Sequence, residues 1–255
     1  MKRRHFLQMM MAGAAVAATP LPLWAFDRQH RITIGQFHPH GEGSQPRPSA
    51  LRRLLQEVDR RTSIEVDTDI QSVGPNRDEL FEFPMIAWSG ERAFEPMDDE
   101  ALSVLRTYLL AGGFLFVDSA EGLEEGPFME SVQRDLNRAF PDRGIQQLPQ
   151  DHTLHQSFYL IDQPVGRVDR ANHLRGIADS DRIAVVLSAN DLLGAMARDT
   201  FGNWEYDVRP NGDRQREMAF RLGINLVMYA LTVNYKADQV HIPFILERRQ
   251  WQVDD

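Results

Sequence analysis

Polar and ionisable residues follow four separate apolar runs of the sequence, and they are the side chains best placed to do chemistry. If these runs are parallel strands of one open sheet, their carboxyl ends meet at one edge, where such sheets bind ligands. The residues that we predict for a functional site at this edge are His38, Trp88, Glu91, Asp118 and Asp191. Three carboxylates held close together would raise the pKa of at least one of them, unless a cation or basic side chain lies among them. We therefore expect either a bound divalent metal ion or a hydrogen-bonded pair between His38 and a carboxylate.

Two groups of histidines offer other readings. His38 and His40, with an acid close by, provide ligands that suit a divalent cation, but a solvated loop whose histidines cap backbone groups is the favoured explanation. Asp151, His152 and His155 form the second group, and a turn in which Asp151 caps backbone amides accounts for their spacing. For this reason we place the predicted site at the strand ends rather than in this local segment.

Several chemistries are excluded or disfavoured by what the chain lacks. It has no cysteine, so disulfides, cysteine nucleophiles and thiolate metal sites are excluded. Ser119 follows an apolar run as a hydrolase nucleophile would, but the Gly-x-Ser-x-Gly frame that allows the strained turn of such enzymes is missing. Gly112 and Gly113 precede a strand rather than a helix, so they indicate the end of a helix and not a phosphate-binding loop.

The elements that must position the candidate residues alternate between strands and helices, as in a parallel sheet covered on both faces. The predicted strands are 31–37, 64–70, 83–88, 114–117 and 183–187. The predicted helices are 49–61, 98–109, 129–140 and 215–233. Alternating polar residues in the second strand indicate an edge strand, whereas the continuous apolar runs of the third and fourth indicate central strands. The less regular stretches 151–161 and 165–177 predict an insertion such as a hairpin.

The first 25 residues have the order of parts found in a twin-arginine export signal. Arg3 and Arg4 begin a pattern that continues with His-Phe-Leu-Gln, a short Ala- and Gly-rich apolar stretch follows, and Ala25 offers a small residue at the cleavage position. We therefore expect a signal peptide over 1–25, a single α/β domain over 26–255, and a soluble periplasmic protein.

Charge and hydropathy limit the partners of this domain. The formal net charge of −9 becomes −12 when the three basic residues of the signal are removed. Such an acidic domain repels phosphate backbones and anionic lipid surfaces, which argues against binding to nucleic acid or to a membrane surface. The apolar run 222–233 is shorter than the ~20 residues needed to cross a bilayer, so no membrane span is expected in the mature form.

Four stretches spread over most of the mature chain carry a family resemblance: FPMI at 83–86, GGFLFVD at 112–118, SFY at 157–159 and NLVMYAL at 225–231. They resemble the uncharacterised bacterial domain-of-unknown-function family 4159. This resemblance implies a fold similar to class I glutamine amidotransferases, a flavodoxin-like α/β sandwich with a mostly parallel central sheet. It implies no established activity. The family commonly has Gly-His where this chain has Gly90-Glu91, and a second acid where Ser119 stands, and both differences weaken a metal site there.

Two functions follow from these observations. The first is a non-catalytic binding or accessory protein of the cell envelope, on an amidotransferase-like scaffold without the nucleophilic cysteine, with a small molecule or an envelope protein as its partner. The second is a metal-dependent hydrolase built on His38, Asp118 and Asp191 at the carboxyl ends of the strands. The missing cysteine and the absence of a strong catalytic motif favour the first.

Overall fold

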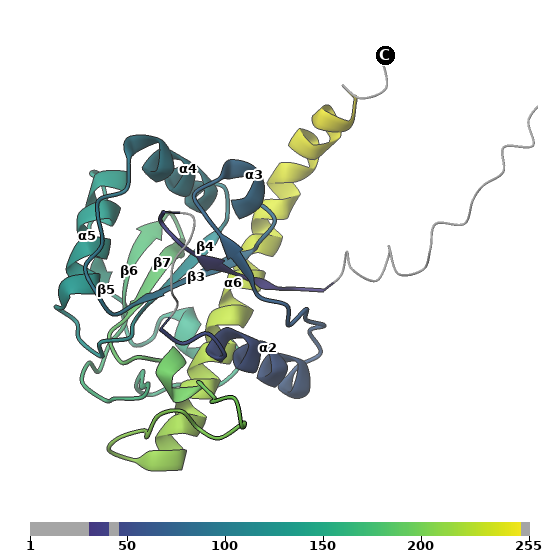
Figure 1. Ribbon diagram of the computed structural model, residues 1–255. Helices are drawn as coiled ribbons and strands as arrows, with labels where there is room; N and C mark the ends of the chain where they lie inside the picture. Colours follow the sequence, from purple (N-terminus) through teal and green to yellow (C-terminus); the bar gives the residue numbers. More distant parts are fainter. Residues whose placement is uncertain (1–30, 41–45, 251–255) are drawn as a thin grey trace, which may run out of the picture. The chain divides into compact units, whose positions relative to one another are not determined.

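A seven-stranded sheet forms the centre of the protein, with the strand order β2-β1-β3-β4-β7-β6-β5 (Figure 1). This computed structural model describes residues 31–40 and 46–250, with side chains up to residue 232. The predicted signal peptide lies outside the described residues. The strands are β1 (Ile34–Phe37), β2 (Gln71–Val73), β3 (Met85–Gly90), β4 (Phe114–Ser119), β5 (Gln146–Gln147), β6 (Arg175–Asp179) and β7 (Arg182–Ser188).

Four of the six strand pairings in the sheet are parallel. Strands β2, β1, β3, β4 and β7 pair in parallel in that order, whereas β6 pairs antiparallel with β7 and β5 pairs antiparallel with β6, so that β5 again runs in the direction of β7. The predicted α/β class with a mostly parallel sheet is therefore confirmed. The central positions of β3 and β4 agree with their continuous apolar sequences, because strands covered on both faces need apolar side chains on both.

Helices cover the sheet on both faces (Figure 1). The helices are α2 (Ala50–Arg61), α3 (Arg77–Leu80), α4 (Asp99–Leu110), α5 (Pro127–Ala139) and α6 (Gly212–Gln250). Helices α2 and α6 share one hydrophobic core with alternate strand residues such as Met85 and Phe116. Helices α4 and α5 share the other core with the residues between them, such as Ile86 and Val117. Successive residues of one strand therefore point into different cores, which decides below which polar side chains can meet.

Local sequence signals explain where the helices begin. The Asp98 side chain accepts a hydrogen bond from the Ala101 amide at 2.7 Å and so caps the first turn of α4. Pro127 opens α5, where its missing N–H costs nothing because the first amides of a helix have no partner within it.

Among the described residues, none of the helices combines the length and the apolar character that a membrane span needs.

The edge strand lies later in the chain than its polar–apolar alternation predicts. Within 64–70 the only strand pairing is a single bridge between Ile32 and Val66, and the strand itself is β2. Ile64, Val66 and Ile70 still pack partly buried against the core that contains α2 and α6. Their alternation therefore reflects one-sided burial, while the pairing with β1 is formed mainly by the next three residues.

The irregular region 151–177 also differs from the prediction. It contains a 3-10 helix, η2 (Thr153–Gln156), and the predicted hairpin is formed instead by β6 with β7, joined at Ser180 and Asp181. Ser180 has a φ of 55°, the left-handed conformation that a tight turn between antiparallel strands requires. The short strand β5 then pairs with β6 and ends the sheet.

Candidate functional site

Ser89, Asp118 and Ser188 lie side by side at the carboxyl ends of three neighbouring strands. Ser89 is in register with Asp118, and Asp118 is in register with Ser188. The residues two positions earlier, such as Phe116, belong to the core that contains α2 and α6, so these three polar side chains face the same way. The Ser89 hydroxyl is buried and makes no hydrogen bond within the described part of the chain.

Asp118 has no solvent exposure and binds backbone amides far along the sequence. One carboxylate oxygen accepts from the Leu192 amide at 2.9 Å and the other from the Leu193 amide at 2.8 Å. Burial, followed by the nearby charge of Asp191, raises the pKa of Asp118 to about 7, although these two amides and the Ser188 hydroxyl act in the opposite direction. Asp118 therefore caps the turn before η3 (Leu193–Ala195) and titrates near neutral pH.

Asp191 is equally buried and is surrounded by donors. Arg47 binds it through two nitrogens, Nε at 3.2 Å and Nη2 at 2.9 Å, and Nε of Arg167 donates to the same carboxylate. The Gly194 amide donates at 3.0 Å. The turn is shaped for this carboxylate: Asp191 has a φ of 51°, and a Cβ at position 194 would lie 2.3 Å from an Asp191 oxygen.

Arg47 and Tyr206 complete the group, which we call the strand-end cluster: Asp118, Asp191, Arg47, Arg167 and Tyr206. The Arg47 guanidinium is 7% exposed, donates to the Tyr206 hydroxyl at 3.0 Å and to the Ala120 carbonyl at 3.2 Å, and lies 4.1 Å from the Tyr206 ring centre. Two arginines thus neutralise a buried carboxylate, which is what burial of a charge demands.

Arg47, Arg167 and Tyr206 are absent from the residues predicted from the sequence. The signal in the sequence is indirect: a buried acid needs a charged or hydrogen-bonding partner, and arginines lie in several of the loops that adjoin the strand ends. Nothing local would have selected among them, because Arg47 and Asp191 are 144 positions apart.

His38 was predicted as the basic partner of a carboxylate at the strand ends, and the structure gives Asp191 two arginines as partners. It is buried directly after β1, where its amide donates to the Val73 carbonyl at 2.9 Å. Burial lowers the pKa of His38, which favours a neutral ring over the predicted imidazolium. The cations that bind Asp191 are Arg47 and Arg167.

Trp88 and Glu91 lie away from the strand-end cluster. Trp88 precedes Ser89 in β3, so it points to the opposite face of the sheet and packs against Phe37, Phe94 and Phe128 at ring-centre distances of 5.3, 5.0 and 5.8 Å. Glu91 is exposed beyond the end of β3. Of the five predicted residues, Asp118 and Asp191 belong to the strand-end cluster, whereas strand alternation turns Trp88 away and Glu91 lies past the end of its strand.

No group of three or more His, Asp or Glu side chains that could hold a metal ion occurs among residues 31–40 and 46–232. The predicted trio of His38, Asp118 and Asp191 is not such a group. Glu42, the acid close to His38 and His40 in the sequence, lies outside the described residues.

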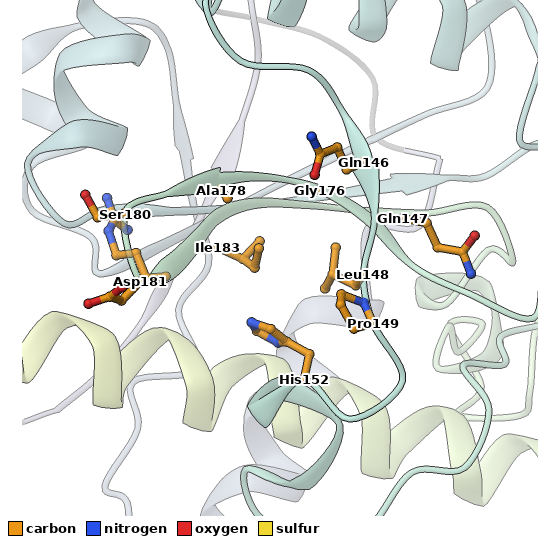
Figure 2. Close-up of a pocket in the computed structure, with 11 residues that line it drawn as sticks. Gln146, Gln147, Leu148, Pro149, His152, Gly176, Ala178, Ser180, Asp181 and Ile183 are labelled. Atoms are coloured by element: carbon orange, nitrogen blue, oxygen red, sulfur yellow. The ribbon is translucent and has the colours of Figure 1, made fainter.

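A pocket of about 280 Å³ lies at the other end of β7, beside the hairpin (Figure 2). We call it the edge pocket; its lining residues are Gln146, Gln147, Leu148, Pro149, His152, Gly176, Ala178, Ser180, Asp181, Arg182 and Ile183. His152 belongs to the segment that the sequence led us to set aside. Its side chain, rather than that of Asp151, caps the following turn by accepting from the Leu154 amide at 3.2 Å.

The fold and the strand-end cluster define a mixed α/β protein with a mostly parallel sheet and a charged, buried group at the ends of its central strands. The chain belongs to the family described as Domain of unknown function (DUF4159), which matches residues 32–231. The resemblance seen in the sequence is thereby confirmed. No curated protein matches the chain.

Proposed function

We propose that this is an exported protein of the cell envelope that acts by binding a small molecule or an envelope protein, and not by catalysis. One observation carries the proposal. All four oxygens of Asp118 and Asp191 accept hydrogen bonds from the chain itself, and neither residue is exposed. A general acid or base must come within hydrogen-bond reach of the proton that it transfers. These two carboxylates are enclosed, so the strand-end cluster serves to hold the chain together.

The structural role of the cluster is visible in what it connects. Arg47 precedes α2, Asp118 is the last but one residue of β4, Asp191 follows β7, and Tyr206 lies in the segment before α6. Their hydrogen bonds join these four segments at the carboxyl edge of the sheet. The strand-end cluster therefore stabilises the scaffold, and a different surface of the protein is available for binding.

We assign the scaffold to the flavodoxin-like, class I amidotransferase-like group. The order β2-β1-β3-β4, followed by the parallel strand β7, corresponds to the doubly wound order 2-1-3-4-5. Helices on both faces agree with that arrangement. Without a cysteine, such a scaffold has no amidotransferase nucleophile, which supports a binding role.

Export is supported by the twin-arginine pattern of the first 25 residues, and the family match begins only at residue 32. Mass spectrometry of the periplasmic protein should show Phe26 as its first residue. Changing Arg3→Lys together with Arg4→Lys should retain the protein in the cytoplasm, because the translocase reads the arginine pair. Unchanged export of the double variant would contradict the proposed route.

Binding and catalysis are distinguished by complementation. In a deletion strain with an envelope-stress phenotype, Asp118→Asn should restore growth as well as the wild-type gene when both proteins reach equal levels. The metal content of the purified variant should also equal that of the wild type. Loss of complementation at equal protein level, or a loss of bound metal, would show that the carboxyl takes part in chemistry and would refute the proposal.

A further inference from the structure

Small and apolar residues form one wall of the edge pocket. Gly176 packs closely against its neighbours, because a Cβ there would lie 2.4 Å from the Val185 carbonyl oxygen and 2.8 Å from Leu148. Ala178 lies two residues further along β6 and is exposed. Together with Leu148 and Ile183 these residues give the pocket an apolar floor, and Figure 2 shows His152 opposite Ile183.

The hydrogen bonds of His152 determine what it offers to the pocket. Its Nδ1 accepts from the Leu154 amide, so this nitrogen carries no proton. Burial lowers the pKa of His152, although Asp151 acts in the opposite direction, and the ring is therefore neutral at pH 7. A neutral ring with an accepting Nδ1 carries its proton on Nε2, which makes that atom a donor.

The His152 ring is held in place by its surroundings. It packs against Tyr229 of α6 at a ring-centre distance of 5.5 Å. The Tyr229 hydroxyl is itself fixed, because it accepts from the Ile183 amide at 2.8 Å. The donor and the apolar floor are thus joined through Tyr229, as expected of a preformed site.

The charges around the pocket favour a neutral ligand. The Arg182 guanidinium donates to the carbonyls of Gly113 at 3.0 Å and Gly112 at 3.3 Å, at the end of α4, and also binds Asp179. Its charge is therefore already engaged away from a ligand. Asp181 is exposed at the rim, so an anion would meet a carboxylate on an acidic protein.

We propose that the edge pocket binds a small uncharged molecule with one aromatic or branched aliphatic body and one carbonyl or ether oxygen, which accepts a hydrogen bond from Nε2 of His152. This inference rests on the proposed binding function and adds the place and the class of ligand. The volume of about 280 Å³ is at the low end for ligand pockets, which suits a single ring rather than a larger cofactor.

Two probes of nearly equal shape test the proposal on the purified mature protein. Acetophenone has an aromatic ring and a carbonyl oxygen, whereas cumene replaces that oxygen with a methyl group. NMR spectra of protein labelled at the methyl groups of Leu148, Ala178 and Ile183 report binding at the pocket. We expect saturable shifts of these signals with acetophenone, and affinity for cumene that is about fivefold lower, the factor typical of one neutral hydrogen bond.

Two variants separate the hydrogen bond from the cavity. His152→Asn keeps an oxygen that can cap the Leu154 amide but loses the ring and its Nε2 donor, so it should weaken acetophenone about fivefold more than it weakens cumene. Ala178→Leu fills the pocket without touching the cap, so it should abolish binding of both probes. Circular dichroism and melting temperature verify that each variant folds.

Three outcomes would overturn the inference: shifts confined to other parts of the protein, equal affinity for both probes in the wild type, or unchanged acetophenone binding in folded Ala178→Leu. These outcomes leave the proposed binding function standing, because that function is decided by complementation with Asp118→Asn. Conversely, failed complementation would refute the binding function even if acetophenone occupied the pocket.

Discussion

Replacing Asp118 by asparagine tests whether the strand-end cluster holds a proton at neutral pH. Asparagine has nearly the same shape, cannot ionise, and presents one oxygen and one NH₂ group to the amides of Leu192 and Leu193. One of the two amide hydrogen bonds is therefore lost. At pH 6, where the wild-type carboxyl is largely protonated, we expect the variant to be less stable by about 1–3 kcal/mol, the cost of one unsatisfied buried group.

The difference between the two proteins should shrink as the pH rises. The pKa of Asp118 is about 7 in the folded protein and 3.8 for an aspartate exposed to water, as in the unfolded chain. Between these two pH values the folded chain therefore holds a proton that the unfolded chain has released. A raised pKa of this kind stabilises the protein at low pH, and the contribution is lost as the pH rises through 7. From pH 6 to 8.5 the wild type should lose about 1.4 kcal/mol that the variant does not lose, the free energy of one pH unit.

Urea unfolding of both proteins at pH 6, 7 and 8.5 measures this change. Burial lowers the pKa values of His38, His152 and His155, which makes stability fall below about pH 6.5. That effect is common to both proteins and cancels in the difference. Asp207→Asn removes an 85% exposed carboxylate and should run parallel to the wild type over the whole range.

A difference that stays constant within about 0.5 kcal/mol, or one that grows with pH, would refute the reasoning. Either result would mean that Asp118 is ionised throughout and that Arg47 and Arg167 neutralise both carboxylates of the cluster. The ¹³C chemical shift of the Asp118 carboxyl gives an independent reading, since it should titrate near pH 7.

Two further substitutions test the ion pair and the topology. Arg47→Met leaves Asp191 buried with only Arg167 as a charged partner, so urea should show that the free energy of unfolding falls by about 3–5 kcal/mol. The control Arg209→Met removes one partner of an exposed ion pair and should lower it by less than about 0.5 kcal/mol. Similar losses in the two variants would contradict a stabilising role for the strand-end cluster. Val185→Asp puts an unpaired charge into the core beside β7 and should lower the free energy of unfolding by more than about 4 kcal/mol. The control Thr200→Asp places the same residue at an exposed position and should change the melting temperature little. A Val185→Asp variant that melts within a degree or two of the wild type would count against the central position of β7.

Much of the scaffold could be predicted because its signals are local. The strands β3 and β4 are continuous apolar runs, which only a strand covered on both faces tolerates. The start of α4 is marked by Asp98, whose carboxylate accepts from an amide three residues later. Such signals need no knowledge of the rest of the chain, and the succession of strands and helices along the sequence follows from them.

The sheet's edges could not be predicted in the same way. The alternation in 64–70 reports that one side is buried, but not which backbone pairs, and the strand formed at β2 instead. At the other edge, β5 has two residues and both are exposed, so no hydrophobic pattern marks it. Pairing at an edge depends on where the neighbouring strand ends, which is a property of the assembled sheet.

The sequence by itself determined that Asp118 and Asp191 stand at strand ends, because each follows an apolar run and parallel strands bring such positions to one rim. Because successive side chains of a strand point to opposite faces of the sheet, the sequence also implied that Trp88 and Ser89 lie on different faces. Only the tertiary structure decided that Arg47 and Arg167, rather than His38, bind Asp191. It also decided that the pocket lies beside His152. The physical reason is the same in both cases: a buried charge takes whichever cation the folded loops bring within reach, and a cavity exists only where segments distant in the chain fail to fill the space between them.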